Sequence, residues 1–380
     1  MKPLEGILVL EFCQFMAGPS AGLRLADLGA RVIKIERPNV GEGGRQIAIK
    51  NLFVDDSSLV FQTINRNKES YAANLKDVGD LARIKKLIEV ADVMTHNFRP
   101  GVMEKIGLDF ETVQKINPKL VYATVTGYGT KGPWAKKPGQ DLLVQCMSGL
   151  VNLTGNKNDE PVPMGLATAD IITGAHLVHG ILAAVLNSYK TKKGSLVEVS
   201  LLESMLDFQF EVITTYLNDG NKVPLRAKQG AAHAYLGAPY GVYKTKDGYL
   251  SLAMGSLVNL GKVLNNTQLQ NYTDSNDWFE KRDEIMDILR SFLVDKTTSE
   301  WLAILEKEGI WCSNVYDYKT LLNHEAYKVL GMDQTLELKS GEKVHTTRCP
   351  IRLNDKVIYA EKAAPRVGED TESLIKEFNL

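Results

Sequence analysis

Short apolar runs alternate with helical patterns in the first part of the chain. Residues 7–12 (ILVLEF) form an apolar, β-prone run, and a helical pattern follows Gly18 and Pro19. Gly29 ends that helix, and residues 31–36 (RVIKIE) predict a second strand. A strand, a helix and a strand within ~30 residues make a βαβ unit, which requires parallel strands joined by a helical crossover.

The same alternation continues beyond this unit. Residues 80–91 predict an amphipathic helix, and residues 92–96 and 120–126 predict further strands. Strands this apolar are typical of a sheet with both faces covered. We therefore expect an α/β fold whose large domain contains a Rossmann-like, doubly wound sheet.

A long helix follows. Residues 168–189 have apolar side chains on nearly every side of the predicted helix, which favours a buried position. Residues 196–199 then predict a strand, and residues 200–216 predict another helix.

The pattern changes again beyond residue 217. Residues 218–229 are polar and turn-rich, as in a linker. Residues 240–244 and 249–253 predict a β-hairpin, and helices dominate residues 278–309. These elements predict a smaller α+β domain, and the tail of residues 365–380 ends in an amphipathic helix.

Composition narrows the class of protein. The 380 residues are 44% hydrophobic and 24% charged, which are ordinary globular values. Lys and Arg total 45 against 46 Asp and Glu, so the net charge of −1 argues against a protein whose main task is holding nucleic acid or an anionic membrane.

The cysteines and the apolar stretches narrow the class of protein further. The four cysteines (Cys13, Cys146, Cys312 and Cys349) are scattered without a C-x-x-C pair, which excludes a zinc ribbon and a thioredoxin motif. The start has no signal-peptide pattern, and the most apolar stretch, residues 171–186, is too short to span a bilayer. We expect a cytoplasmic protein.

Cationic and amide side chains follow several predicted strands. The first βα turn lacks the G-x-G-x-x-G fingerprint, and the second strand ends at Glu36 and Arg37. Arg37 is suited to a phosphate, although spacing alone favours a solvated arginine at the end of a strand. Together with Arg45 and residues 65–68 and 97–101, it predicts several ligand-facing loop groups that suit a polyphosphorylated ligand.

Asp170 is the leading candidate for catalysis. With Thr168 as the N-cap, Asp170 lies in the first turn of the long helix, where the helix dipole stabilises a carboxylate. Such an aspartate would stay ionised at neutral pH and be able to act as a nucleophile. Asp141 is a candidate second acid near it. For both residues, an ordinary acid at a helix N-terminus is the alternative interpretation.

Histidines do not suggest a metal centre. His176 and His179 lie three residues apart, and no further ligands are evident on that face of the helix. We therefore expect buried, hydrogen-bonded histidines and no metal site.

Eight segments along nearly the whole chain carry a resemblance to a known family. They are PLEGILVLEF, AGPSAGLRLADLGARVIKIERP, NRNKES, ADVMTHNFRPGVMEKIGLDF, INPKLVYATVTGYGTKGPW, DLLVQCMSGL, GLATADIITGAHLVHGILAAVL and APRVGEDT. In this order and spacing they resemble the family III CoA-transferases, which include formyl-CoA transferase, crotonobetainyl-CoA:carnitine CoA-transferase and α-methylacyl-CoA racemase.

The resemblance implies a reaction. Asp170 aligns with the family's catalytic aspartate, which attacks an acyl-CoA thioester and forms a mixed anhydride. The released CoA thiolate then forms an aspartyl-CoA thioester, and the acceptor acid takes over CoA in the reverse order of steps. Backbone amides must stabilise the oxyanions of these steps. The implied activity is CoA transfer from an acetyl- or succinyl-CoA-like donor to a small carboxylic acid, with CoA as a substrate and no permanently bound cofactor.

The resemblance also implies site residues and an assembly. The residues implied for CoA are Met16, Ala17, Arg37, Ala73, Asn74, Leu75, Lys76, Asn97, Phe98, Arg99 and Lys105. Those implied on the acyl and acceptor side are Gln14, Gln140, Asp141, His233 and Tyr235. The large domain would comprise residues 1–220 and take in residues 330–380, with residues 221–329 as the small domain. Two such chains would form an interlocked homodimer.

Two departures from the family pattern bear on the substrate. The racemase branch has a histidine where this chain has Gln140, and a glutamine does not shuttle protons at neutral pH. Formyl-CoA transferase has a run of glycines where residues 230–241 have only scattered ones, which argues against formyl or oxalyl specificity. A 2-methylacyl-CoA racemase and a non-catalytic CoA-binding protein remain the alternatives.

Overall fold

The computed structural model describes residues 2–380, which form two compact units. Unit 1 contains residues 2–144, 166–208 and 330–380. Unit 2 contains residues 145–165 and 209–329. Residues 145–165 and 209–220, which the sequence analysis placed in the large domain, therefore belong to unit 2, while the C-terminal segment belongs to unit 1.

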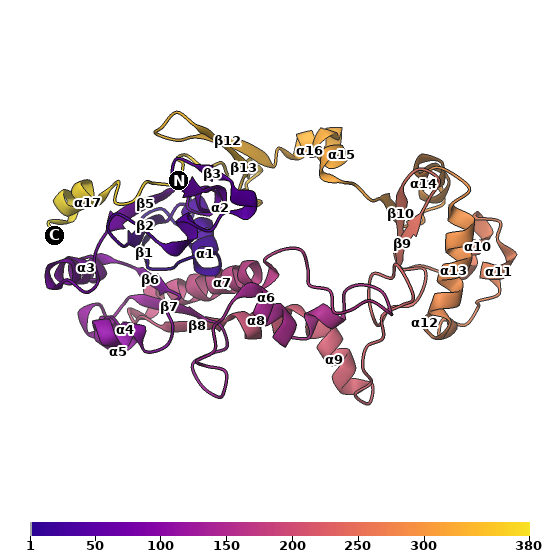
Figure 1. Cartoon of the computed structure of the whole chain (residues 1–380), viewed down its shortest axis with the longest axis horizontal. Helices are drawn as coiled ribbons and strands as arrows, with labels where there is room; N and C mark the ends of the chain where they lie inside the picture. The colour runs from indigo at the N-terminus through magenta and orange to yellow at the C-terminus, as the bar shows by residue number, and fades with distance from the viewer. Residues whose placement is uncertain (1) are drawn as a thin grey trace. The chain divides into compact units, whose positions relative to one another are not determined.

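Unit 1 is built on a six-stranded sheet in which every strand pair is parallel. Its strands are β1 (Leu8–Glu11), β2 (Arg31–Glu36), β5 (Lys68–Ala72), β6 (Val93–His96), β7 (Val121–Thr126) and β8 (Leu196–Ser200). They lie in the order β5-β2-β1-β6-β7-β8 (Figure 1). Successive strands are therefore added in one direction from β1 to β5 and in the opposite direction from β6 to β8, so the strand order reverses between β1 and β6, as in Rossmann-type sheets. The prediction of a parallel α/β sheet is confirmed.

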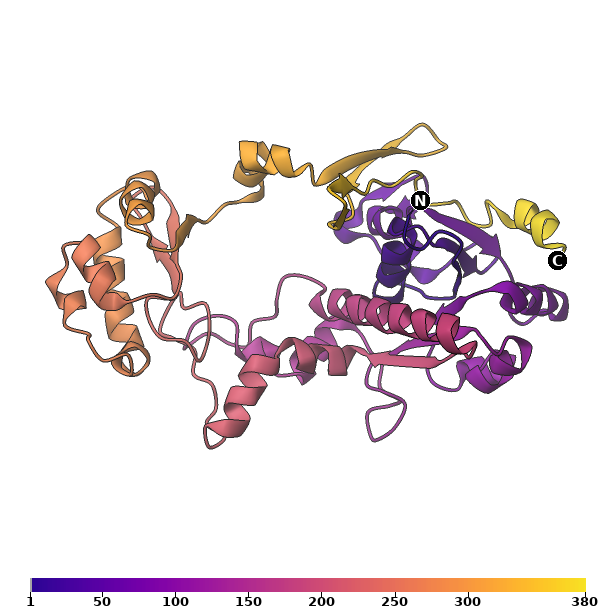
Figure 2. The ribbon, with the colours of Figure 1, turned by 180° about the vertical axis from the view of Figure 1, so that it is seen from behind.

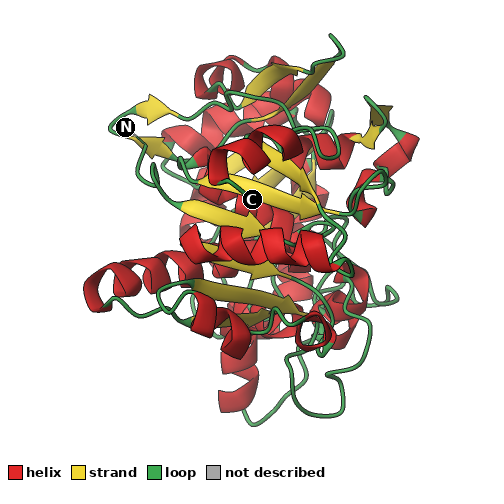
Figure 3. Cartoon of the chain, turned by 90° about the vertical axis from the view of Figure 1, so that its left-hand side faces the viewer, coloured by secondary structure: helices red, strands yellow, loops and turns green. Residues whose placement is uncertain are grey.

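Helices cover both faces of this sheet. They are α1 (Ala17–Asp27), α2 (Leu59–Ile64), α3 (Val78–Val90), α4 (Val102–Ile106), α5 (Phe110–Ile116), α7 (Thr168–Thr191), α8 (Leu201–Phe208) and α17 (Thr371–Phe378). Figure 1 shows α3, α5 and α17 on one side and α1 and α7 on the other, and Figure 3 shows the strands behind the covering helices. Because both faces are covered, every residue of β1 and β6 is buried.

The core on the α3 side explains why these elements pack. Ile84, Leu87 and Ile88 of α3 are fully buried against Leu10 and Ile33 of the sheet. Each such side chain stabilises the fold by roughly 1.5–3 kcal/mol. The helical spacing of apolar residues in α3 thus faces the sheet, as its sequence predicts.

The C-terminal segment completes unit 1. Residues 330–380 add α17 and two antiparallel hairpins, β12 (Asp333–Glu337) with β13 (Lys343–Thr347) and β14 (Arg352–Leu353) with β15 (Lys356–Val357). Asp370 accepts from the N–H of Ser70 in β5 at 2.8 Å, and Ser70 O accepts the N–H of Asp370. The segment is thereby held along the edge strand (Figure 1).

Helix α7 is 24 residues long and runs beside β8 (Figure 2). Among residues 2–380 it is the one helix that is long and apolar enough to cross a membrane, by length and composition alone. The expectation that the apolar stretch of residues 171–186 is too short to span a bilayer was therefore wrong. One face is buried against α1, α8, β7 and β8. The other face is not: Ile171, Leu186 and Tyr189 are more than half exposed, which corrects the expectation of burial all round.

Unit 2 contains the smaller set of elements. They are α9 (Phe210–Asn218), β9 (Gly241–Lys244), β10 (Tyr249–Leu252), α10 (Leu257–Val263), α11 (Thr267–Gln270), α12 (Asp277–Glu280), α13 (Arg282–Leu293), α14 (Thr298–Lys307), β11 (Cys312–Asn314) and α15 (Tyr318–Asn323). Strands β9, β10 and β11 form an antiparallel sheet, which confirms the predicted hairpin. Helices α6 (Asp141–Met147) and α16 (Glu325–Leu330) lie at the boundaries between the units.

Candidate active site

The loops that follow the parallel strands all lie at one edge of the sheet. Residues 12–16 follow β1, Arg37 follows β2, residues 73–76 follow β5 and residues 97–101 follow β6. In open α/β sheets, ligands bind at this carboxyl edge, at the point where the strand order reverses. The reversal here lies between β1 and β6. Most residues implied for CoA thus gather where the fold favours a ligand, and Lys105 follows on α4.

Asn97 joins the two loops that flank this reversal. Its Oδ1 accepts the N–H of Gln14 at 2.8 Å, and its Nδ2 donates to the carbonyl of Gln14 at 2.7 Å. The adjacent Phe98 stacks on His96, with ring centroids 6.1 Å apart. The Asn97 side chain therefore fixes the loop after β1 to the loop after β6.

The cationic residues at this edge divide into two groups. Arg37, Lys76, Arg99 and Lys105 are exposed and make no ion pair within residues 2–380, so they are available to an anionic ligand. Arg45 and Lys68 are buried in ion pairs with Glu36 and Glu11, and Arg66 with Asp27. The expectation that Arg45 and residues 65–68 face a ligand is therefore wrong for these three cations.

Three neighbours of Lys76 have structural contacts. The Ala73 side chain is 1% exposed and lies in the core, and Leu75 packs against that core. Asn74 donates its N–H to Asp80 at 2.8 Å and accepts the N–H of Lys76 at 3.1 Å, which fixes the turn into α3. The Ala73 methyl is therefore not presented to a ligand at the surface.

Asp170 lies in the first turn of α7, as predicted, but its helix begins differently. The N-cap is Ala167, which has no capping side chain, and Thr168 is already the first helical residue. Asp141, the first residue of α6, accepts the N–H of Asp170 through Oδ2 at 3.1 Å. The two acids of the sequence analysis thus meet at two helix N-termini.

The environment of Asp170 disfavours its ionised form. Burial raises the pKa of the Asp170 carboxyl to about 7, and the nearby Asp141 carboxylate adds to the rise. The expectation that Asp170 stays fully ionised at neutral pH is therefore wrong. Desolvation and a like charge outweigh the favourable helix dipole, whose contribution is typically only ~0.3–1 kcal/mol at exposed positions.

Glycines set the positions of the two acids. A Cβ at Gly174, one turn after Asp170, would lie 2.2 Å from Ser20 Oγ and 2.8 Å from the carbonyl oxygen of Ala17. Helices α1 and α7 therefore approach closely, with their N-termini side by side. A Cβ at Gly127 would lie 2.6 Å from Cα of Gly139, so the long loop after β7 closes just before Gln140 and Asp141.

The remaining predicted residues have local partners. Gln140 is exposed, immediately before α6. In unit 2, His233 lies 3.3 Å from Glu211, and Tyr235 donates its hydroxyl to the carbonyl of Lys222 at 3.0 Å. His176 is half-buried and pairs with Asp207, whereas His179 is exposed, so the expectation of two buried histidines is wrong. Within residues 2–380, no group of three or more His, Cys, Asp or Glu side chains is arranged to hold a metal.

The sequence analysis did not identify the groups beneath the loop after β1. Glu11, Lys34 and Glu42 are buried there, and Phe15 has a φ of +66° with its ring half exposed. The signal was present, because Glu11 and Lys34 interrupt apolar strands. A charge in a strand buried on both faces requires a partner.

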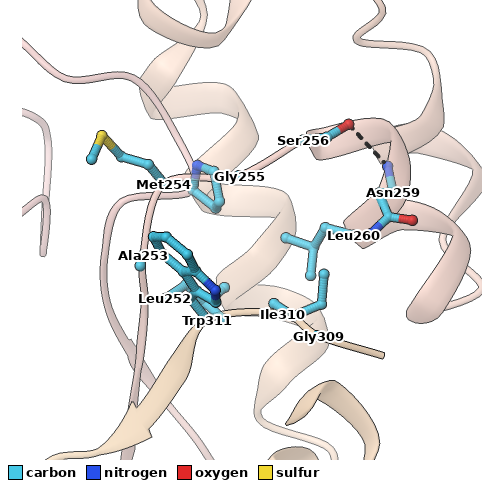
Figure 4. A pocket seen from close by; sticks show the side chains of 11 residues that line it. Leu252, Ala253, Met254, Gly255, Ser256, Asn259, Leu260, Gly309, Ile310 and Trp311 are labelled. Carbon is cyan, nitrogen blue, oxygen red and sulfur yellow. Dashed lines mark hydrogen bonds between the residues drawn. The ribbon is translucent and has the colours of Figure 1, made fainter. Parts of the chain in front are cut away.

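A cavity of about 180 Å³ lies in unit 2, beside β10 (Figure 4). Leu252, Met254, Ile310 and Trp311 line it, and none of its lining side chains is charged. The cavity therefore has no counter-charge for a carboxylate, unlike the cationic edge of unit 1.

Comparison with protein families gives one match over nearly the whole chain. The model of "CoA-transferase family III" matches residues 4–371. Succinyl-CoA:glutarate CoA-transferase from Mus musculus is 33% identical over 99% of this chain and 86% of its own length. Alpha-methylacyl-CoA racemase from Homo sapiens is 28% identical over 99% of this chain and 94% of its own length.

Solved structures agree with the fold. A CAIB/BAIF family protein from Brucella suis has a TM-score of 0.84 at 31% sequence identity, and the match covers 99% of both chains. The likeness therefore extends over both units and is not confined to the parallel sheet.

Proposed function

The chain belongs to CoA-transferase family III and is a CoA-transferase, and on this premise we propose that it acts through a covalent intermediate on Asp170. The observation that carries this proposal is the meeting of Asp170 with Asp141 at the edge of the sheet where Rossmann-type folds bind ligands. We further propose a succinyl-CoA-like donor and a small dicarboxylate acceptor, because a similar enzyme is a succinyl-CoA:glutarate CoA-transferase.

The proposed reaction needs no net proton transfer. A carboxylate oxygen of Asp170 attacks the thioester carbonyl carbon, and CoA leaves as a thiolate. The thiolate then attacks the Asp170 carbonyl carbon of the mixed anhydride, releasing the donor acid and leaving an aspartyl-CoA thioester. The acceptor carboxylate then attacks that thioester, which forms a second anhydride and releases the CoA thiolate. The thiolate attacks the acceptor carbonyl carbon of this anhydride, which gives the acceptor acyl-CoA and frees Asp170. A protein carboxylate suits this relay because all three acids have similar acyl-transfer energies.

The raised pKa of Asp170 has a use in this reaction. Burial makes the carboxylate poorly solvated, and a poorly solvated carboxylate is a stronger nucleophile once its proton is lost. Burial also keeps water from the anhydride, which hydrolysis would destroy. The carboxyl pair therefore fits a nucleophile better than an acid that is purely structural.

The exposed cations supply the proposed CoA site. Arg37, Lys76 and Arg99 follow three strands at the same edge, and Lys105 lies in α4. CoA carries three phosphate groups, which suit such cations. We propose that these side chains bind the phosphates, while Met16 and Ala17 at the start of α1 lie along the arm that ends in the sulfur. The proposed assembly is a homodimer.

Transfer is tested with acyl-CoA donors and labelled free acids. Succinyl-CoA or acetyl-CoA is incubated with a panel that includes labelled glutarate and oxalate, and the products are identified by mass spectrometry. The proposal requires labelled acyl-CoA and the appearance of the free donor acid. Epimerisation of a 2-methylacyl-CoA without any added acid supports the racemase instead, and Gln140 argues against that outcome.

The covalent step has its own test. Protein incubated with acyl-CoA is trapped with hydroxylamine or borohydride, and the peptide containing Asp170 is analysed by mass spectrometry. A modified Asp170 is expected. An unmodified Asp170 in protein that turns over would refute the aspartyl mechanism while leaving CoA transfer itself intact.

A further inference from the structure

We propose that Glu42 and Lys34 are positioning residues for CoA binding, because they hold the loop after β1 in a conformation that Phe15 would not adopt by itself. This inference rests on the proposed CoA site at the carboxyl edge of unit 1. It concerns residues 13–16 of the loop that connects β1 to α1.

A neutral cluster of charges is buried beneath this loop. Three carboxylates and three cations are each at most 4% exposed: Glu11, Glu36, Glu42, Lys34, Arg45 and Lys68. Lys34 lies 3.0 Å from Glu11, Lys68 lies 2.8 Å from Glu11, and Arg45 lies 2.7 Å from Glu36. Buried charges without partners are strongly destabilising, so each of these side chains is confined to a narrow range of positions.

Side chains bind the backbone of three consecutive loop residues. Lys34 Nζ donates to the carbonyl oxygen of Cys13 at 2.8 Å. Asn97 binds both the N–H and the carbonyl of Gln14. Glu42 Oε2 accepts the N–H of Phe15 at 3.0 Å. The loop is therefore held from β2, from the loop after β6 and from the segment after β2.

Glu42 is itself rigidly placed. Its N–H donates to Glu36 Oε2 at 3.0 Å, and its Oε2 also accepts the N–H of Gly44 at 2.6 Å. Its second oxygen, Oε1, makes no hydrogen bond but lies 3.5 Å from Nζ of Lys34. Lys34 thus places a positive charge beside the Glu42 carboxyl group under the loop.

Phe15 is the residue that needs this support. Its φ of +66° is left-handed, a conformation that costs a residue with a side chain roughly a factor of 5 to 30 in population relative to glycine. Its ring is 50% exposed and contacts Gly43, so packing does little to compensate. The hydrogen bond to Glu42 is the contact that holds the backbone N–H of Phe15 in this orientation.

The conformation of Phe15 sets the start of α1. Met16 is the N-cap, and no side chain caps the helix there. The direction of the Met16 and Ala17 backbone therefore depends on the turn made at Phe15. In the proposed site these two residues contact CoA, so a loop that relaxes would have to be reordered before CoA binds.

The test exploits the different tolerance of glycine and alanine for a positive φ. Phe15→Gly and Phe15→Ala both remove the ring, but glycine alone adopts the left-handed turn without cost. Each is made in the natural chain and in the Glu42→Met background. Methionine has a similar length but no oxygen to accept the N–H of Phe15, whereas a glutamine amide oxygen would still accept it. Affinity for CoA is measured by calorimetry, and acyl-CoA KM and kcat are measured in the transfer assay.

With Glu42 present, the loop is held in both variants, and their CoA dissociation constants should agree within about twofold. In the Glu42→Met background, Phe15→Ala should bind CoA at least about fivefold more weakly than Phe15→Gly. The difference should appear in KM and leave kcat nearly unchanged. Equal CoA affinity of the Gly and Ala variants in the Glu42→Met background would overturn the inference.

The outcome is separable from that of the proposed function. Calorimetry with CoA requires no turnover, so the Gly and Ala comparison is decided even if the natural chain transfers nothing to any acid tested. Thermal unfolding of each variant is the control for folding. A difference in CoA affinity between Gly and Ala variants that are both fully folded at the assay temperature excludes unfolding as its cause.

Discussion

At the scale of single residues, the decisive feature is that Asp170 lies beside a second carboxyl group. Asp141 accepts the N–H of Asp170, and together with burial it brings the pKa of Asp170 to about 7. A proposed nucleophile with this pKa is only partly ionised in neutral solution. Its chemistry and its contribution to stability should therefore both depend on pH near neutrality.

The first prediction concerns the rate. Only ionised Asp170 attacks a thioester, so kcat/KM for acyl-CoA should rise between pH 6 and 8 with a midpoint near 7. Asp141→Asn removes the like charge but keeps an oxygen that accepts the N–H of Asp170. The midpoint should then move to lower pH, but stay above the usual aspartate value near 4 because burial remains. A midpoint that is unmoved or raised in Asp141→Asn would contradict this assignment.

The second prediction concerns stability. The folded-state pKa of Asp170 is raised above its unfolded value, so folding favours the protonated form. The protonated carboxyl is present in both states below pH 4, and stability is lost as pH rises from 4 through 7. Asp170→Asn carries no charge, so it should gain roughly 1–3 kcal/mol relative to the natural chain between pH 5 and 8. Denaturant unfolding of both proteins at pH 5 and at pH 8 measures this difference in the free energy of unfolding.

Asp170→Asn should also reduce transfer by at least about a thousandfold while CoA affinity stays within about threefold. Isothermal calorimetry of CoA is the control. A parallel loss of CoA affinity and activity would indicate a structural role for Asp170.

At the scale of elements, the packing of α1 on α7 brings the two sides of the proposed site together. The contact depends on the missing side chain of Gly174, which lets α7 touch Ser20 and the backbone of Ala17. Because Ala17 follows the loop after β1 and Asp170 lies one turn before Gly174, this contact links the proposed CoA loop with the proposed nucleophile.

The third prediction follows from this contact. Gly174→Ala places a methyl group against the backbone of α1, which cannot move as a flexible side chain would, so a cost of about 2–4 kcal/mol is expected. The melting temperature and kcat should both fall. Ala175→Ser, at the exposed next position of α7, is the matched control and should change neither. Full stability of Gly174→Ala would show that the two helices are not locked at this point.

At the scale of the whole molecule, apolar side chains remain exposed on the outer face of α7. Leu186 and Tyr189 are 57% and 55% exposed, on a helix whose other face is buried against α1, α8, β7 and β8. Exposed apolar side chains gathered on one face mark an interaction surface. This face is a candidate part of the proposed homodimer interface.

The fourth prediction tests that interface. Light scattering after size exclusion should give twice the chain mass of 42.1 kDa. Leu186→Glu should lower the dimer fraction at low protein concentration, because a charge would be buried in the interface. Asn187→Glu adds the same charge at the next exposed position and should leave the dimer intact. A monomeric natural chain would refute the dimer.

The sequence by itself determined the local elements and the identity of the acids. Strands and helices are set by the spacing of apolar residues along the chain, so β1, β2, β6, β7 and α3 could be predicted within one or two residues. Asp170 and Asp141 could be chosen because a residue's type and its place at the start of a helix are local properties.

The tertiary structure alone decided which charges face a ligand and how the acids titrate. Arg45, Arg66 and Lys68 are as polar in sequence as Arg37 and Arg99, yet they are buried in ion pairs with acids 9, 39 and 57 residues away. The pKa of Asp170 and the support of Phe15 by Glu42 also depend on groups 29 and 27 residues away. Burial and electrostatic interactions are sums over neighbours in space, and those neighbours are known only once the chain has folded.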